Sequence, residues 1–468
     1  MSPLELAAAA GVLILFLYAD VVTNRPRGKL PPSPPSLPFL GHLHLIGRLA
    51  HRSFHELQLR YGGGGDGLLL LQLGRRRTLV VSTAAADLFR NHDLAFASRP
   101  RSMNADKLMY GCRNVSFAPY GEEWRLGKKA ATVHLLSSRR VDSLAPVRAA
   151  EVAALVARAR RAAEEGEAVE LRALLYGYTN AVVTRATTGG AGATAEKLEQ
   201  LMGYSKELMA GFQPEDLLPD AAARVVRWAT GLDKKLDGIA EEWDKFLSEM
   251  LAAHNMIVAA TETSSHTLEW AMAELVANPR VMAKLQDEIA RVAADDDDEP
   301  AIAEAELSKM GYLRAVLKEV LRLHAPAPLL VPHESTTPAV VQGYEIPAKT
   351  ALFVNVWAVG RDPAAWDAPE EFRPERFVGG GPAVDFRGTD YQLIPFGAGR
   401  RICPGINFAL PILELALAEL LRHLDWELPA GMRPADLDMV EAPGVTAPRR
   451  VPLVLVPKCR TLAPPALQ

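Results

Sequence analysis

The alternation of hydrophobic and polar residues predicts a protein built mainly from helices. In several long stretches the hydrophobic positions recur every three or four residues, as expected when one face of a helix packs against a core. These stretches are residues 141–163, 195–209, 222–253, 263–276, 281–292, 307–323 and 406–423. Short alternating segments, which predict strands, are residues 68–73, 78–82, 339–341 and 452–456. The pattern therefore indicates a mainly α-helical body with small β-sheets.

A mostly apolar run occupies residues 4–22. A helix of this length is about long enough to cross a bilayer, which takes ~20 residues. Three basic residues follow within residues 25–29, and basic residues at the end of a span favour the cytoplasmic side. A cleaved signal peptide is the alternative, but its positive charges would precede the apolar run. We therefore expect residues 1–24 to form a transmembrane anchor.

A basic and proline-rich segment, residues 25–40, follows the expected anchor. Prolines at this density favour extended, stiff backbone, so this segment is expected to be a hinge that holds the body away from a membrane. No second linker of comparable length follows. We therefore expect residues 41–468 to form one domain, which is large for a single unit.

The composition is typical of a globular protein with a large core, with 49% hydrophobic and 23% charged residues. The 52 Lys and Arg against 56 Asp and Glu give a net charge of −4, which argues against binding nucleic acid through global positive charge. The cysteines Cys112, Cys403 and Cys459 are too few and too widely spaced for a disulfide framework or a Cys/His zinc motif. This spacing indicates a reducing compartment.

Cys403 is the strongest candidate for chemistry. It lies in the segment Pro-Phe-Gly-Ala-Gly-Arg-Arg-Ile-Cys-Pro-Gly at residues 395–405, whose glycines allow tight turns and close backbone approach. Arg401 is well placed to pair with a carboxylate. A helix predicted from Ile406 would place its positive end beside the sulfur and favour a thiolate. An isolated cysteine in such a loop would be a structural residue, whereas this ordered combination predicts a metal ligand.

This segment resembles the haem-binding loop of the cytochrome P-450 superfamily, Phe-x-x-Gly-x-Arg-x-Cys-x-Gly. The matching residues are Phe396, Gly399, Arg401, Cys403 and Gly405. The resemblance implies a single large helical fold that encloses haem b, with Cys403 as the proximal ligand of the iron and Arg401 paired with a haem propionate. A thiolate ligand pushes electron density onto the iron and favours cleavage of the O–O bond.

Two further motifs of the family follow in the expected order. Glu319-Val-Leu-Arg322 matches Glu-x-x-Arg, whose spacing places both side chains on one helical face, and Pro374-Glu-Arg-Phe377 supplies Arg376. The resemblance implies a buried triad of Glu319, Arg322 and Arg376, in which the carboxylate tolerates burial because it is paired on both sides. Taken alone, Glu-x-x-Arg would be an ordinary surface ion pair of little worth.

The segment Ala259-Ala-Thr-Glu-Thr-Ser264 resembles the family's oxygen-activation motif. It implies that Glu262 and Thr263 are catalytic residues over the distal face of the haem. Splitting dioxygen needs two protons, and a hydroxyl with a carboxylate can organise water for their delivery. The alternative is that Thr263 only hydrogen-bonds its own helix. Ala260 replaces the usual glycine, so the local opening of the helix is expected to differ.

Two less specific positions complete the expected cofactor site. Trp124 and Lys128 resemble the helix whose Trp-x-x-x-Arg pattern binds a propionate, although lysine keeps the charge without the bidentate geometry. An ordinary amphipathic helix is the alternative there. His333 stands where relatives often carry a propionate-binding arginine. Whether this histidine is neutral or charged is open, because an ordinary histidine pKa lies near physiological pH.

One departure from the family pattern lies near residues 254–256. Relatives carry a loop, a helix and the first turns of the long helix over the haem between the counterparts of residues 243–254 and 256–260. Here the two flanks are nearly fused, so an internal segment is expected to be missing. Surface loops tolerate deletion, but removal of packed helix does not come free. This predicts a splice or gene-model variant with impaired folding or activity.

The likeness is greatest to the plant microsomal A-type group. It implies a monooxygenase anchored in the endoplasmic reticulum membrane, with a cytosolic catalytic domain. The enzyme would use O2 to oxidise a small lipophilic plant metabolite. No flavin or nicotinamide fingerprint occurs in the chain, so electrons would come from a separate NADPH-dependent cytochrome P-450 reductase, which basic residues such as Arg400 would face. Two alternatives stay open: a haem-thiolate isomerase or dehydratase, and a truncated non-functional paralogue or splice form.

Overall fold

The computed structural model describes residues 28–62, 67–108, 111–188, 218, 220–247, 254–293, 302–379 and 384–460. The expected membrane anchor and the predicted helix at residues 195–209 lie outside this part of the chain. Among the described residues, no helix combines the length and the apolar character needed to cross a bilayer.

Helices dominate the described chain, as the hydrophobic pattern predicts. The α-helices are α2 (Ala50–Tyr61), α3 (Ala85–Asn91), α4 (Met103–Leu108), α5 (Glu122–Ala130), α6 (Ser138–Ser143), α7 (Ala145–Glu165), α8 (Leu171–Thr188), α11 (Asp220–Thr230), α12 (Leu232–Leu247), α13 (His254–Ala277), α14 (Pro279–Ala293), α15 (Gly311–Leu323), α16 (Val356–Val359) and α17 (Ile406–His423). Short helical turns are η1 (Leu43–Leu45), η2 (Ala131–Leu135), η3 (Glu306–Lys309), η4 (Pro374–Phe377), η5 (Gly399–Arg401) and η6 (Pro434–Asp436).

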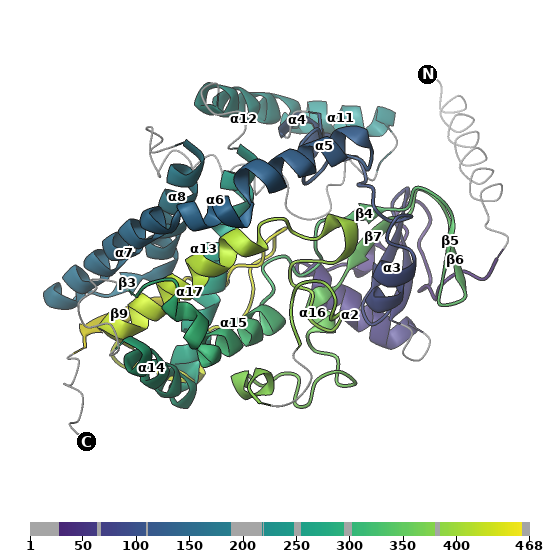
Figure 1. Ribbon diagram of the computed structural model, residues 1–468. Coiled ribbons are helices and arrows are strands. Elements are labelled where there is room, and N and C mark those ends of the chain that lie inside the picture. The colour runs from purple at the N-terminus through teal and green to yellow at the C-terminus, as the bar shows by residue number, and fades with distance from the viewer. Residues whose placement is uncertain are drawn as a thin grey trace, which may run out of the picture.

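The strands form small sheets. A four-stranded sheet has the order β1 (Leu68–Leu73), β2 (Arg76–Val81), β7 (Ala351–Val354) and β4 (His333–Glu334), and a three-stranded sheet has the order β3 (Val169–Glu170), β9 (Val454–Cys459) and β8 (Leu424–Glu427). A hairpin joins β5 (Ala339–Val341) to β6 (Tyr344–Ile346). In Figure 1 the four-stranded sheet lies with α2 and α3 at one end of the molecule, and the long helices α7, α8, α13, α14 and α17 fill the other.

Helix α13 is the centre of the helical part. It packs against α8, α15 and α17, and its second half is buried on nearly every side. Trp270 and Met272 are fully enclosed there, and buried Glu269 accepts hydrogen bonds from the Arg172 guanidinium at 3.0 and 3.1 Å. A helix that is buried all round needs no polar face. The helix that carries Glu262 and Thr263 is therefore fixed from several sides.

Two predicted helices are each divided in the structure. The stretch at residues 141–163 is split between α6 and α7, because Pro146 stands in the first turn of α7 and cannot continue a preceding helix. The stretch at residues 222–253 is split at Gly231, whose φ of +67° belongs to the left-handed region that favours glycine. By contrast, α17 covers exactly the predicted residues 406–423.

The first described residues of the proline-rich segment are docked on the body. The Leu70 N–H donates to the Pro32 carbonyl at 2.8 Å, and the Glu345 N–H donates to the Lys29 carbonyl at 2.8 Å. At these two points the segment is attached to β1 and β6.

Candidate functional site

The Cys403 loop holds the sulfur at the N-terminus of α17. The Cys403 N–H donates to the Phe396 carbonyl at 2.9 Å, and the Gly405 N–H points at the Cys403 Sγ at 3.4 Å. Gly397 and Gly399 have φ values of +73° and +65°, so glycine is required at both turns. Burial raises the pKa of the Cys403 thiol, and the Gly405 N–H opposes that shift. The loop is thus shaped to present one sulfur beside a helix N-terminus.

Four basic side chains gather beside this loop, and each donates to backbone carbonyl groups. We call Arg99, Lys128, His333 and Arg401 the cation cluster. Arg99 donates to the carbonyls of Val331 at 2.6 Å and Pro332 at 2.9 Å, and Arg401 donates to those of Ala97 at 2.6 Å and Ala118 at 2.7 Å. Lys128 donates to the Arg400 carbonyl, and His333 donates to the Phe96 carbonyl at 2.8 Å. The structure therefore places Lys128, His333 and Arg401, the residues suggested from the sequence for the propionates, in one region beside Arg99.

Burial and the charge of Arg401 lower the pKa values of the basic groups in the cation cluster. Burial lowers the pKa of Arg401 to about 10, and it lowers the pKa of Arg99 and of His333 well below their ordinary values. The charge of Arg401 further lowers the pKa values of Arg99, Lys128 and His333. A ligand with two carboxylates would relieve this repulsion. One sulfur next to such a cluster fits haem, whose propionates are anionic.

Helix α5 places Trp124 in contact with two of these cations. The Arg401 guanidinium carbon lies 4.1 Å from the centre of the indole ring, and the Lys128 Nζ lies 5.3 Å from it. The indole N–H donates to the Val115 carbonyl at 3.0 Å, which fixes the ring. Cation–π contacts of this kind stabilise the charged side chains where water is scarce. Trp124 and Lys128 therefore lie beside the Cys403 loop.

The predicted triad is in contact at the junction of α15 and η4. Arg322 donates to the two Glu319 carboxylate oxygens at 2.7 and 2.8 Å, and Arg376 donates to Oε1 at 2.9 Å. Glu319 and Arg322 are fully buried. The two guanidinium groups also donate to the backbone carbonyls of Gly360, Pro369, Asp367, Ala368 and Glu371. The triad thus ties α15 to the 360–376 segment.

The distal candidates lie on the first half of α13. The Thr263 hydroxyl donates to the Ala259 carbonyl at 2.7 Å, which is the self-bonding expected of a helical threonine. The Glu262 carboxylate accepts from the Thr446 hydroxyl at 3.2 Å and is largely buried. The Thr179 hydroxyl donates to the Thr261 carbonyl at 3.0 Å and anchors this part of α13 to α8.

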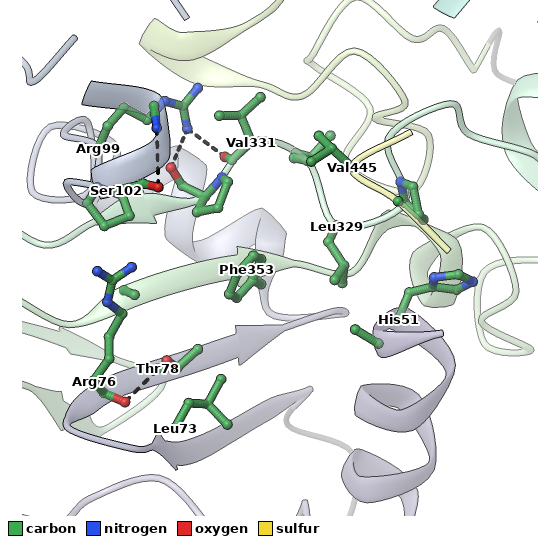
Figure 2. A pocket seen from close by; sticks show the side chains of 18 of the residues that line it. His51, Leu73, Arg76, Thr78, Arg99, Ser102, Leu329, Val331, Phe353 and Val445 are labelled. Carbon is green, nitrogen blue, oxygen red and sulfur yellow. Dashed lines mark hydrogen bonds between the residues drawn. The ribbon is translucent and has the colours of Figure 1, made fainter. Parts of the chain in front are cut away.

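A pocket of about 290 Å³ opens beside the four-stranded sheet. Figure 2 shows its walls, which come from α2, the sheet, the 328–332 segment and the 443–445 loop. Its lining is largely apolar and includes Leu73, Phe117, Leu329, Val331, Phe353 and Val445. Arg99 borders both this pocket and Arg401, and Leu330 reaches from the pocket toward Gly397. The pocket therefore adjoins the Cys403 loop.

Glu441 anchors the C-terminal wall of this pocket to α2. Its buried carboxylate accepts from the Arg52 guanidinium at 2.5 Å and from the Trp357 indole N–H at 3.0 Å. Burial by itself raises the pKa of Glu441, but the charges of Arg52 and His51 help to outweigh it and lower this pKa overall. The 443–445 loop is thus held at one end by Glu441 and at the other by the Thr446 contact with Glu262.

Sequence reasoning missed three residues of this region, namely Arg99, Asp93 and Thr446. Arg99 offers a weak signal, because it is a cation between the apolar Phe96-Ala97 pair and Pro100. Asp93 and Thr446 are ordinary loop residues by sequence. Their contacts arise from segments far away along the chain.

Comparison with known proteins bears directly on this site. The cytochrome P-450 family model matches residues 31–255 and 250–452. The chain is 40% identical to the 3-hydroxyindolin-2-one monooxygenase of Zea mays over 516 residues, covering 98% of this chain and 95% of the relative. It is 38% identical to the (+)-menthofuran synthase of Mentha piperita (92% and 93% covered) and 38% identical to the 4-hydroxyphenylacetaldehyde oxime monooxygenase of Sorghum bicolor (92% and 88% covered).

The chain therefore belongs to the cytochrome P-450 family, and within it to the plant A-type group. It is an oxidoreductase with haem b as its cofactor, and its activity is that of a haem-dependent monooxygenase. This class uses O2, a small substrate and electrons from a redox partner.

Proposed function

We propose that this chain hydroxylates or otherwise oxidises a small lipophilic plant metabolite, with Cys403 as the proximal thiolate ligand of the haem iron. The observation that carries this proposal is the position of the Cys403 Sγ, at the N-terminus of α17 and 3.4 Å from the Gly405 N–H. An N–H directed at sulfur stabilises the thiolate form. When bound, haem supplies the iron that activates dioxygen.

The cation cluster would hold the two haem propionates. Arg401 and Arg99 carry the permanent charges, and Lys128 adds a third from α5. Each of these side chains would exchange a backbone carbonyl for a carboxylate, and charge-assisted hydrogen bonds are the stronger kind. Trp124 would keep Arg401 and Lys128 in place through their contacts with its ring.

Glu262 and Thr263 would deliver protons on the distal side. The Thr263 hydroxyl donates its hydrogen bond to the Ala259 carbonyl, so its oxygen can still accept a hydrogen bond from a water molecule. Glu262 would pass a proton to that water when it is in its carboxylic acid form, and would then take up another proton from solvent; the Thr446 hydroxyl donates to one of its oxygens. This arrangement supports oxygen insertion over an isomerase or dehydratase, which needs no proton delivery.

The apolar pocket beside the sheet would admit the substrate. Its walls of leucine, valine and phenylalanine side chains favour a lipophilic molecule, and its volume of about 290 Å³ suits a compact one. The relatives named above include enzymes of indolic, terpenoid and phenolic chemistry. We propose the same broad class of compact metabolites here.

We further propose that residues 4–22 anchor the chain in the endoplasmic reticulum membrane, with the catalytic domain in the cytosol. The length of this apolar run and the basic residues after it support that placement. Electrons would come from an NADPH-dependent cytochrome P-450 reductase in the same membrane. Arg400, an exposed residue of the Cys403 loop itself, is suited to contact such a partner.

A second candidate is a truncated form that binds haem poorly. The family model matches in two ranges that meet at residues 250–255, next to the join predicted at residues 254–256. The alignment with the Zea mays relative extends over 516 residues, more than the 468 of this chain, so that relative has residues without a counterpart here. These observations support an internal omission directly before the first described turn of α13.

The carbon monoxide difference spectrum of the reduced, membrane-bound protein separates these functions. We expect a thiolate-type Soret band in the parent chain, its loss in Cys403→Ala, and its retention in Cys459→Ala, a control at an exposed cysteine. A parent with no haem signal favours the truncated form. A band that survives in Cys403→Ala would sink the ligand assignment. Product formation that requires both reductase and NADPH then separates oxygen insertion from isomerisation.

A further inference from the structure

Residues 93–98 form a strap that connects the Cys403 loop with β4. Successive backbone carbonyls of this strap accept hydrogen bonds from both sides. The Ala95 carbonyl accepts from the Thr336 N–H at 2.8 Å, and the Ser98 carbonyl accepts from the Glu334 N–H at 2.9 Å. Between them, the Phe96 carbonyl accepts from the His333 Nδ1 at 2.8 Å, and the Ala97 carbonyl accepts from the Arg401 Nε at 2.6 Å. The strap therefore sets the spacing between Arg401 and His333, two members of the cation cluster.

Asp93, at the start of this strap, binds the Cys403 loop with its side chain. Its Oδ1 accepts the Arg400 backbone N–H at 3.0 Å, and its Oδ2 pairs with the Arg400 guanidinium. The Asp93 side chain is only 13% exposed. A Cβ atom on Gly399 would lie 2.1 Å from Oδ1, so the loop passes directly against this carboxylate.

These contacts differ from those of an ordinary surface ion pair. An exposed pair of charges contributes little because water screens it. Asp93 instead accepts a backbone N–H of η5, the turn that ends two residues before Cys403, from a largely buried position. A hydrogen bond between a backbone N–H and a carboxylate is worth more than a neutral one. The Asp93 carboxylate thus fixes the backbone of the loop itself.

We propose that Asp93 is a positioning residue for the haem-thiolate loop. It locks the Gly399–Arg401 turn against the strap, and thereby sets where Cys403 stands relative to Arg401 and His333. Without this carboxylate, the loop keeps the hydrogen bond from Arg401 to the Ala97 carbonyl, but Arg400 loses its hydrogen bonds to the strap. The inference rests on the proposed role of Cys403, because only then does the position of the loop matter for the cofactor.

The test compares Asp93→Ala with Asp436→Ala in the full chain. Asp436 is a close match, because it also accepts a backbone N–H (3.0 Å) and the guanidinium of a single arginine, Arg433, but in an exposed loop. We expect amide hydrogen exchange at Arg400 to be about tenfold faster in Asp93→Ala and unchanged in Asp436→Ala. Haem should transfer to an acceptor protein several-fold faster, with a smaller thiolate-type share of the carbon monoxide spectrum.

Asp93→Asn keeps a hydrogen-bond acceptor while removing the charge, so we expect amide exchange at Arg400 to be faster than in the parent chain but slower than in Asp93→Ala, and unchanged in Asp436→Asn. If Asp93→Ala fails to fold, Asp93→Asn is compared with Asp436→Asn instead. Equal amide exchange at Arg400 and equal haem transfer in these two variants would overturn the proposal. Equal behaviour of Asp93→Ala and Asp436→Ala would also overturn it. Amide exchange is measured on haem-free protein as well, so the Asp93 inference is tested even if the parent chain shows no thiolate-type band and the proposed function fails.

Discussion

His333 is the member of the cation cluster that carries no charge at neutral pH. Its Nδ1 lies 2.8 Å from the Phe96 carbonyl, and a carbonyl only accepts, so Nδ1 carries the proton. Burial, with the charge of Arg99, holds its pKa well below 6.5. His333 is therefore neutral at neutral pH, and its Nε2 is an acceptor. It would bind a propionate oxygen only after gaining a second proton.

This lowered pKa predicts a pH dependence of stability. Just below pH 6.5 the unfolded chain protonates His333 while the native protein does not, so the unfolded state binds more protons there. The free energy of unfolding of the haem-free protein should therefore fall as the pH drops below 6.5, and reach a plateau above it. His333→Asn should lose less stability on acidification in denaturant titrations. A change at the exposed His44 serves as the control, and equal acid sensitivity of both variants would contradict the prediction.

At this scale, motif spacing could predict some residues and not others. Cys403, Arg401 and Gly405 lie in one short segment, so their proximity follows from covalent connection alone. Arg99, Asp93 and Thr446 come from other segments and carry no distinctive local chemistry. Their roles depend on tertiary contacts, such as the approach of Asp93 to Gly399, that no spacing along the chain records.

At the scale of elements, the junction of α15 and η4 depends on one buried carboxylate. Glu319 is fully buried and receives both Arg322 and Arg376. Replacing it by glutamine leaves two guanidinium groups without their countercharge. Breaking a buried pair in this way typically costs ~3–5 kcal/mol. We therefore expect Glu319→Gln to lower the free energy of unfolding by about that amount in chemical denaturation.

Glu375 in the same turn provides the matched control for that prediction. It pairs with Lys284 at 2.7 Å, but its side chain is 45% exposed. Exposed pairs are worth about 0–1 kcal/mol, so Glu375→Gln should change stability little. Similar decreases in the free energy of unfolding of both glutamine variants would show that the Glu319 triad contributes no more to stability than an exposed ion pair.

The ends of helices can be predicted from sequence where local residues determine them. Which helices and strands pack against each other cannot. Pro146 and Gly231 divide two predicted helices for reasons visible in the residues themselves. The full burial of α13 and the strand order β1-β2-β7-β4 arise only from packing between distant segments. The sequence of a short hydrophobic strand predicts that it pairs with another strand, but it does not predict which strand that is.

At the scale of the whole molecule, the predicted omission near residues 254–256 has a testable cost. A missing helix would leave apolar surface exposed on its former neighbours, and each buried apolar residue is worth about 1.5–3 kcal/mol. We expect transcripts of the gene to contain an in-frame segment at this point. The longer product should show a higher thermal midpoint and more bound haem than the 468-residue chain. An intact natural message with the present sequence would refute the omission.

The parallel pairing of β2 with β7 also governs when this protein can fold. Thr78 lies beside Ala351, so about 270 residues separate two neighbouring strands. At ~5–20 residues per second, the ribosome delivers β7 roughly 15–55 s after β2. During that interval the β1–β2 hairpin presents an unpaired edge, which is a site for aggregation. We therefore expect the first hairpin to stay open to aggregation until β7 emerges, and haem to bind only after the Cys403 loop, which is synthesised later still.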